Sequence, residues 1–193
     1  MTDLVIGGDG LPRCAWGAGT PDYAVYHDTE WGRPLRGDDA LYERITLEAF
    51  QSGLSWLTIL RKRPAFRLAF DEFRIETVAG YGEADVTRLL ADAGIVRNRA
   101  KIEAAIANAR AALALPEGLS ALLWSFAPPP RPARPTSFAQ VPALTAESTA
   151  LAKALKKKGF RFVGPTTAYA LMQATGMVDD HLAGCHVVAS QAA

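Results

Sequence analysis

Three consecutive segments near the end of the chain read AESTALAKALKKK (146–158), GFRFVG (159–164) and PTTAYALMQATG (165–176). The first segment predicts a helix, because its closing lysines suit the negative C-terminal end of a helix and Gly159 follows them. The third segment predicts a second helix, because Pro165 is a favoured first helical residue and Gly176 ends the run. The sequence therefore predicts two helices joined by a short turn that contains glycine.

The turn between these two helices is a candidate phosphate-binding site. Backbone N–H groups of Gly164 and of the helix start, including Thr166, would point outward together, and such an arrangement binds a phosphate well. Lys158 and Arg161 lie beside the turn and add positive charge. An ordinary helix–helix turn with solvated lysines explains the same pattern, so both interpretations stay open. Residues 97–101, RNRAK, offer a weaker candidate of the same form.

The rest of the chain is also predicted to be helical, which gives an all-α fold class. Apolar residues recur at helical spacing, acidic residues precede such runs, and glycine follows them. The further predicted helices cover residues 38–50, 83–92, 97–114 and 120–126. Residues 127–142, APPPRPARPTSFAQVP, hold six of the twelve prolines and cannot form a helix. We interpret them as a surface loop rather than a domain linker, because the flanking segments are too short to bury separate cores.

Composition sets limits on the class of protein. The 193 residues suit one domain or two small lobes, and 49% hydrophobic with 21% charged residues excludes a disordered chain. No apolar run reaches the roughly 18 residues of a membrane span. The start MTDLVIGGDG carries no secretory signal and the two cysteines make no disulfide framework, so we expect a cytoplasmic protein.

Charge is distributed unevenly along the chain. Residues 1–96 hold 10 Lys/Arg against 15 Asp/Glu, for a net charge of −5, whereas residues 97–193 hold 11 against 5, for +6. A basic half can mark a face that binds a polyanion such as nucleic acid. An unevenly charged solvated surface is the alternative.

Glu48 is the first candidate functional residue outside the turn. It shares the face of Leu41 and Ile45 on the predicted 38–50 helix, where a buried carboxylate is costly unless it is paired. Aromatic residues cluster near it in the sequence: Tyr23, Tyr26, Trp31 and Trp56. An acid among aromatic faces can bind a flat, cationic ligand, although ordinary core packing explains the same residues.

Four of the five Cys and His residues form a candidate metal site. His181 and Cys185 are four residues apart, and Cys14 and His27 make a second pair. A Cys2His2 set is a closed tetrahedral composition of structural zinc, but the spacing of the first pair is loose and chance explains it equally well. Motifs of serine hydrolases, phosphate-binding loops and zinc proteases do not occur in the sequence.

Taken together, these segments resemble the 3-methyladenine DNA glycosylase I family of the helix-hairpin-helix superfamily. The resemblance covers about residues 13–186. It rests on seven blocks in one order: RCAW (13–16), YHDTEWG (26–32), LEAFQSGLSW (47–56), DAGIVR (92–97), LWSF (123–126), ALKKKGFRFVG (154–164) and DHLAGC (180–185).

The resemblance implies the fold and the site residues. It implies a helix-hairpin-helix glycosylase fold whose N- and C-terminal segments are tied by one structural Zn²⁺ per chain. Residues 13–187 would form one compact domain or two lobes, between a flexible extension (1–12) and a flexible tail (188–193). The resemblance implies Cys14, His27, His181 and Cys185 as the zinc ligands and Glu48 as the pocket carboxylate. It implies Tyr23, Tyr26, Trp31 and Trp56 as the aromatic residues of the pocket. For DNA contact it implies Leu54 as a wedge, and Lys158, Arg161, Gly164 and Thr166 at the turn between the last two helices.

The implied reaction is hydrolytic release of 3-methyladenine from alkylated double-stranded DNA by a monomer that flips the base out. No lysine is placed as a Schiff-base nucleophile, so we expect base release without strand cleavage. We expect Asp180, beside a predicted zinc ligand, to support the metal site or to cap a helix, and a catalytic role of Asp179 or Asp180 stays open as the alternative. Two other classes remain as alternatives: a zinc-containing DNA-binding module without catalysis, and a small-molecule pocket unrelated to DNA.

Overall fold

Six helices lie where the sequence pattern predicts them. The computed structural model describes residues 3–188, and these helices agree with the predicted ranges to within two residues at nearly every end. They are α2 (Asp38–Gln51), α5 (Glu83–Ala91), α6 (Arg99–Leu113), α7 (Leu119–Trp124), α8 (Ala146–Lys157) and α9 (Pro165–Ala174). Local caps explain much of this agreement. Asn98 accepts a hydrogen bond from the N–H of Lys101 at the start of α6, and Thr145 and Ser148 form a capping box on α8.

The two aspartates that open α2 act on neighbouring helices. Asp38 accepts hydrogen bonds from the N–H groups of Leu119 (3.0 Å) and Ser120 (2.8 Å) at the start of α7. Asp39 accepts from the N–H of Ile75 (2.9 Å) at the start of α4. A single turn of α2 therefore satisfies helix starts that are far away in the sequence.

Several elements were not predicted. They are β1 (Leu4–Ile6), β2 (Pro12–Cys14), η1 (Ala15–Ala18), α1 (Pro21–Thr29), α3 (Trp56–Ala69), η2 (Asp71–Phe73), α4 (Ile75–Ala79) and η3 (Phe138–Gln140). Helix α3 contains Pro64, which normally argues against a helix interior. It persists because Ile59 and Phe66 are fully buried on its inner face.

A two-stranded antiparallel hairpin adds a small amount of β structure to an otherwise helical chain. Strand β1 pairs with β2 in the register Leu4↔Cys14, in part of the segment for which the sequence predicted a flexible extension. Three residues per strand are too few for alternation to be recognised in the sequence. Arg13 fixes the hairpin, because it bonds Asp9 within the hairpin and Asp28 on α1. Of the predicted tail 188–193, only residue 188 lies within the described residues.

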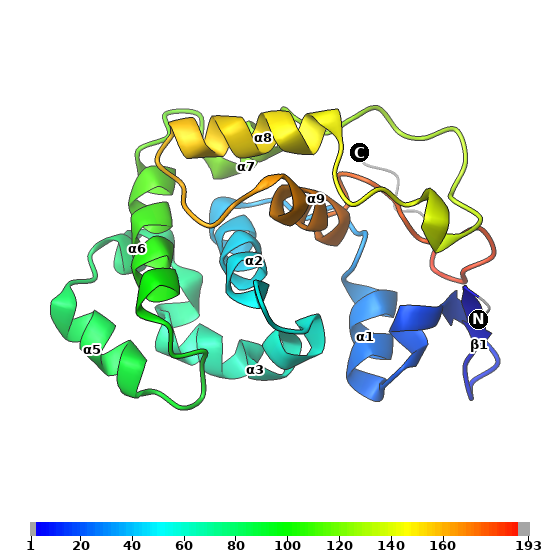
Figure 1. Ribbon diagram of the computed structural model, residues 1–193, viewed down its shortest axis with the longest axis horizontal. Helices are drawn as coiled ribbons and strands as arrows, with labels where there is room; N and C mark the ends of the chain where they lie inside the picture. The colour runs from blue at the N-terminus through cyan, green and yellow to red at the C-terminus, as the bar shows by residue number, and fades with distance from the viewer. Residues whose placement is uncertain (1–2, 189–193) are drawn as a thin grey trace.

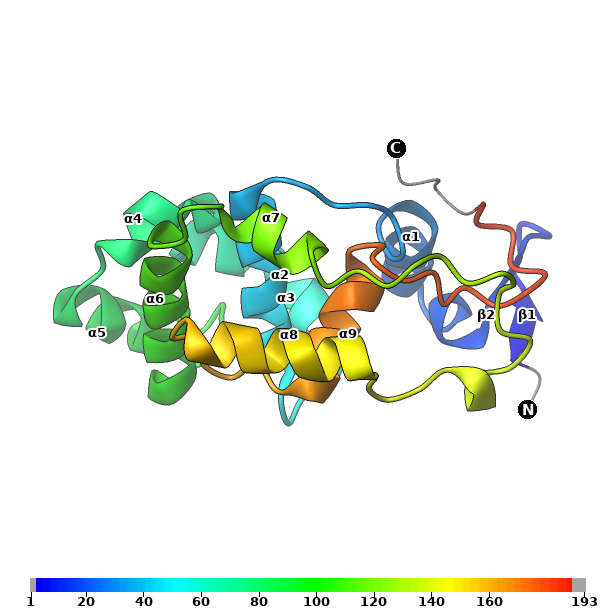
Figure 2. The same ribbon diagram turned by 90° about the horizontal axis from the view of Figure 1, so that it is seen from above.

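The helices divide along the long axis of the molecule (Figure 1). Helices α4, α5 and α6 lie at one end, and α2, α3 and α9 form the centre. Helix α1, the hairpin and the last described residues lie at the other end. Both views place the N-terminal strands beside the C-terminal segment (Figures 1 and 2).

The proline-rich segment 127–142 is a loop, as predicted. Leu119 and Leu123 of α7 and Leu151 and Leu155 of α8 belong to the same hydrophobic core, so the segment does not link two separate cores. It extends to the end that carries the hairpin, where the carbonyl of Pro135 accepts a hydrogen bond from the N–H of Ala183 (Figure 2). A second, much smaller cluster of buried residues lies at that end: Cys14, Leu182, Cys185 and Val187. In the range 3–188, no helix is both long and apolar enough to cross a membrane.

Candidate functional site

A cavity of about 350 Å³ lies between α1, α2, α3 and α9. Its size is within the range of small-molecule sites, about 300–1,000 Å³. Its lining is mostly aromatic, with two carboxylates and two amides: Trp16, Tyr23, Tyr26, Trp31, Glu48, Gln51, Trp56, Phe138, Val141, Ala170, Gln173 and Asp180. The structure therefore brings together the five pocket residues that the resemblance implied.

The aromatic walls are fixed by contacts with one another. Trp16 packs edge-on against Tyr23 (ring centroids 5.7 Å apart) and Trp31 (4.9 Å), while Tyr26 lies 5.3 Å from Trp56. The hydroxyl of Tyr23 accepts a hydrogen bond from the backbone N–H of Leu57 in the first turn of α3, which joins α1 to the helix that carries Trp56. The cavity thus presents several rigid π-faces.

Glu48 is the acid of this cavity that has no protein partner. It is 6% exposed, and its carboxylate accepts no hydrogen bond from another residue in the range 3–188. Burial raises the pKa of Glu48 to about 7, and the charge of Arg44, one helical turn before it, partly opposes that rise. An uncompensated carboxylate beside aromatic faces suits a ligand that is flat and positively charged.

Asp180 has the opposite environment, and its side chain bonds other partners than a metal ligand or a helix start. It is 1% exposed and lines the cavity, where Tyr169 (2.6 Å), Gln173 (2.9 Å) and Arg131 (2.5 Å) donate hydrogen bonds to its oxygens. These bonds use its lone pairs and supply a counter-charge from the proline-rich segment. Asp180 therefore supports the pocket wall; the backbone N–H of His181 is bonded instead by the neighbouring Asp179.

Seven lining residues were not predicted. Their spacing gives little signal, because Phe138 and Val141 come from the proline-rich loop and Ala170 and Gln173 from α9. Gln51 could have been found, because it follows Glu48 by three residues on the same helix and therefore shares its face. Trp16 lies in the quoted block 13–16, but the sequence gave no reason to place it in the pocket.

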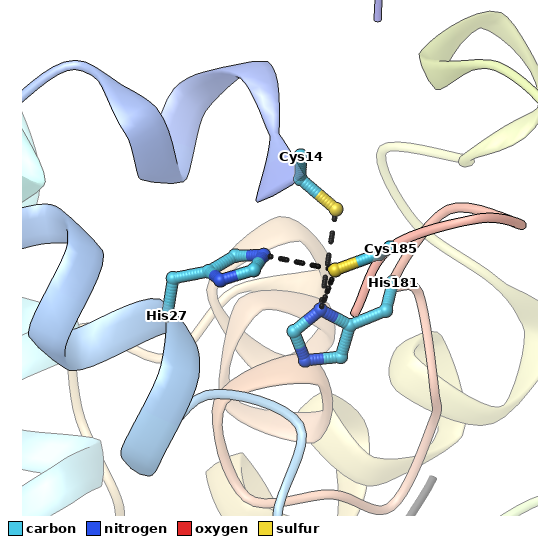
Figure 3. A group of neighbouring side chains, drawn as sticks. All are labelled: Cys14, His27, His181 and Cys185. Carbon is cyan, nitrogen blue, oxygen red and sulfur yellow. Dashed lines mark hydrogen bonds between the residues drawn. The ribbon is translucent and has the colours of Figure 1, made fainter. Parts of the chain in front are cut away.

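The four predicted metal ligands meet in one buried cluster. Cys14, His27, His181 and Cys185 place their ligand atoms within 4.8 Å of one another, although they come from β2, α1 and the C-terminal segment (Figure 3). Sγ of Cys185 lies 3.5 Å from Nε2 of His27 and 3.6 Å from Nδ1 of His181, and Sγ of Cys14 lies 3.9 Å from the same Nδ1. Tetrahedral zinc with ordinary bond lengths would separate S and N ligands by about 3.6 Å. The donor set therefore fits a metal ion.

Surrounding groups orient both histidines for this role. Nδ1 of His27 bonds Asp28 (2.8 Å), and Nε2 of His181 donates to the carbonyl of Trp31 (3.0 Å), so each ring turns its other nitrogen to the cluster. Cys14 and the two histidine rings lower the pKa of the Cys185 thiol, which favours a thiolate. Gly17 allows this packing, because a Cβ there would lie 2.6 Å from the His27 ring.

The four side chains of the Cys2His2 cluster lie directly behind the pocket wall. The ring of His27 packs against Trp16 (5.2 Å), and that of His181 packs against Trp31 (4.7 Å). Because the apolar cluster around Cys14 and Leu182 is small, cross-linking through these four ligands would fix both the chain ends and two aromatic walls.

The predicted turn of the helix-hairpin-helix unit joins α8 to α9. Gly159 and Phe162 have positive φ (97° and 57°), and Phe160 is buried. Arg161, Gly164 and Thr166 are exposed.

Two side chains of α6 anchor the elements that the resemblance implied for DNA contact. Asn108 bonds both backbone groups of Arg161 (2.7 and 3.1 Å), and Lys101 donates to the carbonyls of Phe50 (2.9 Å) and Ser52 (2.5 Å). Lys101 is therefore turned inward and not available as a phosphate ligand in the 97–101 candidate. It holds the loop that presents Leu54, which is 41% exposed.

The protein is mostly helical, with a helix–turn–helix unit and an aromatic pocket in which Glu48 has no partner among residues 3–188. These features define the class of proteins that bind a flat base outside the nucleic-acid stack. Comparison with known proteins defines the family within this class. The model of the methyladenine glycosylase family matches residues 16–188. DNA-3-methyladenine glycosylase 1 of Escherichia coli K12 is 46% identical over 179 residues, which cover 91% of this chain and 96% of that protein. DNA-3-methyladenine glycosylase of Haemophilus influenzae is 44% identical over 177 residues, which cover 90% and 96%.

Solved structures agree with the sequence comparison. A structure of 3-methyladenine DNA glycosylase I from Staphylococcus aureus, described as showing the basis of 3-methyladenine recognition, superposes with a TM-score of 0.88 at 35% identity. The match covers 94% of this chain and 98% of that one. The chain belongs to the methyladenine glycosylase family.

Proposed function

We propose that this protein releases 3-methyladenine from alkylated DNA by hydrolysis of the N-glycosidic bond. The observation that carries the proposal is the cavity that Glu48, buried and without a partner among residues 3–188, lines together with the aromatic rings of Tyr26 and Trp56. Methylation at N3 makes adenine cationic while it is still attached to the sugar, so this base matches the charge and the flat shape of the cavity.

The chemistry needs little acid catalysis. The cationic base leaves as a neutral molecule, so the glycosidic bond is already weak and water can attack the sugar carbon. The face of Trp56 would stack on the ring, and the ionised form of Glu48 would accept hydrogen bonds from the base and favour its charge. Normal adenine lacks the charge, so it would gain less from this pocket. No lysine is among the lining residues of the described chain, which supports base release without strand cleavage.

The turn between α8 and α9 and the loop that carries Leu54 are the proposed DNA-binding elements. Lys158 and Arg161 would contact a phosphate together with N–H groups at Gly164 and Thr166, without reading sequence. Leu54 would enter the gap left by the flipped nucleotide, where unstacking a damaged base costs least. Because α6 anchors both elements, one helix would set the distance between them. Both elements belong to the same chain, so a monomer would suffice to bind double-stranded DNA.

We further propose that the Cys2His2 cluster holds one structural Zn²⁺. The supporting observations are the ligand types, the sulfur–nitrogen separations and the two oriented imidazoles. Four protein ligands leave no open position, so bound zinc would supply cross-linking and no reaction step.

Chromatography of the bases released from methylated DNA tests the proposed reaction. The wild-type protein should release 3-methyladenine, and Trp56→Ala and Glu48→Gln should be much weaker while folding normally. If metal-loaded wild-type protein binds DNA but releases no base, the reaction is wrong and a DNA-binding module takes its place.

A further inference from the structure

A chain of partly buried ion pairs connects α1, α2 and α3, three of the four helices around the cavity. Glu30, at the end of α1, accepts from Arg44 of α2 (2.9 Å) and from Arg63 of α3 (2.6 Å). Arg63 also bonds Glu43 of α2 (2.5 Å), which in turn accepts from Arg67 (3.0 Å). The side chain of Arg44 is only 4% exposed, so its position is set by these partners and not by solvent.

This network ends on a residue of the cavity wall. Nη1 of Arg44 donates a hydrogen bond to the hydroxyl of Tyr26 (3.1 Å), and the guanidinium lies 5.5 Å from the centre of the Tyr26 ring. Tyr26 is 2% exposed and lines the cavity beside Trp56, whose ring centroid lies 5.3 Å away. Within residues 3–188, the ion-pair network therefore makes one side-chain hydrogen bond to the cavity wall, and Arg44 donates it.

The direction of this hydrogen bond constrains Tyr26. A guanidinium only donates, so the phenol oxygen is the acceptor and its own proton must go to a different acceptor. Residues 3–188 offer it no such acceptor within hydrogen-bonding distance. The proton is therefore left for a ligand in the cavity, and the in-plane ring nitrogens of a purine are acceptors of this kind.

We infer that Arg44 is a positioning residue of the base pocket, which makes Tyr26 a hydrogen-bond donor toward the bound base. The inference rests on the proposed function for the identity of the base. Glu48 then supplies an acceptor and Tyr26 a donor, so the cavity distinguishes the edge of the base as well as its charge. Without Arg44, the Tyr26 hydroxyl loses the donor that fixes its orientation, so its proton is no longer directed toward the base.

A double-mutant cycle between Arg44 and Tyr26 tests the inference. The kcat/KM for release of 3-methyladenine is measured for wild type, Arg44→Met, Tyr26→Phe and the double variant. Each single change should lower kcat/KM about five- to tenfold, and the double variant should be no weaker than Tyr26→Phe. Effects that multiply, or an Arg44→Met protein as active as wild type, would overturn the inference.

Two further variants control for structural damage. Arg67→Met removes an arginine from the same network without touching Tyr26, and its kcat/KM should equal that of wild type. Arg44→Lys keeps the charge but cannot bind Tyr26 and Glu30 in one fork, so its smaller loss should vanish in the Tyr26→Phe background. This second cycle decides the matter if Arg44→Met does not fold, and an equal loss in both backgrounds refutes the role.

The wild-type measurement separates the two ideas. If wild type releases the base but the effects of the Arg44 and Tyr26 substitutions on kcat/KM multiply, only the positioning role of Arg44 is refuted. If wild type releases no base, the proposed reaction fails, and the same cycle is read from the dissociation constant of free 3-methyladenine by tryptophan fluorescence. Coupling between Arg44 and Tyr26 in that measurement supports the role, and its absence overturns it.

Discussion

Replacement of Glu48 by Gln is expected to stabilise the empty protein and to weaken base release. Burial raises the pKa of Glu48 from 4.5 to about 7, so the fold favours the protonated form. The stabilising contribution of that form is complete below pH 4.5 and is lost as the pH rises through about 7. At 1.36 kcal/mol per pH unit, the ionised carboxylate costs up to about 3 kcal/mol at pH 8.

Glutamine has nearly the same shape and stays neutral, so it escapes this cost. At pH 8 the variant should unfold at a temperature higher by up to about 6–12 °C, at roughly 2–4 °C per kcal/mol for a chain of this size. At pH 4.5 the two proteins should unfold together. Thermal unfolding followed by circular dichroism from pH 4.5 to 8 measures the difference. A constant difference across this range, or none at pH 8, would refute the argument that Glu48 is buried without compensation.

The same titration should appear in the activity. For a pKa of about 7, the ionised fraction rises from about one tenth at pH 6 to about nine tenths at pH 8, and kcat/KM should rise with it, since this parameter reports the free enzyme. In the Gln variant the profile should be low and flat. Release without enzyme, measured at each pH, is the control, and a flat wild-type profile would contradict the assignment of Glu48 as the charged group.

Four other perturbations have clear expected outcomes. Removal of bound zinc with a chelator, or the Cys14→Ser substitution, should lower the free energy of unfolding by about 4 kcal/mol relative to protein held in free zinc at 1,000 times its Kd. Metal analysis and thermal unfolding measure this loss. An unchanged unfolding temperature would show that the cluster does not hold a metal. Trp56→Ala should weaken binding of free 3-methyladenine by about 1–3 kcal/mol, the usual value of stacking on one base; titration calorimetry measures the loss, and unchanged affinity would place the base elsewhere. Arg161→Ala should weaken DNA binding equally for all sequences and reduce the salt slope by about one, as judged by fluorescence anisotropy between 50 and 200 mM salt. Leu54→Ala should leave that slope unchanged while lowering the rate of base release, and a changed slope would mean that the Leu54 loop also holds phosphate.

Local signals in the sequence account for the parts of the fold that were predicted. Helices α6 and α8 carry their own caps, Asn98 and Thr145, and α9 begins with proline, so their limits follow from neighbouring residues. Helix α1 shows no apolar stripe, because one of its faces lines the cavity and another carries His27. Helix α3 contains Pro64, and only the burial of its inner face keeps it helical. These two helices depend on tertiary contacts that the local sequence does not contain.

The candidate site shows the same division. Residue type and spacing made the four Cys and His residues only a candidate metal site, and the resemblance strengthened that prediction. The spacing alone is weak because Cys14 and Cys185 meet only when the β1–β2 hairpin packs on the C-terminal segment. The pairing of Arg131 with Asp180 joins residues 49 positions apart, so no local pattern could reveal it. Arg44 lies on α2, four residues before Glu48, and its sequence position gives no sign of a role in the pocket. That role is visible only from its hydrogen bond to Tyr26 of α1.

The two acids of the cavity explain why only one is suited to hold a cation. Asp180 is neutralised by Arg131 and bonded by Tyr169 and Gln173, so a positively charged base would have to compete with three donors for its oxygens. Glu48 has no such donors among residues 3–188, and Arg44 offsets the cost of burying its charge only in part, so an entering cation can offset the remainder. A neutral base cannot offset that cost to the same degree, so the instability of the empty pocket becomes selectivity for the damaged base. The proline-rich segment takes part in this arrangement, because its Arg131 pairs with Asp180. Glu48 is then the cavity acid without a partner among residues 3–188.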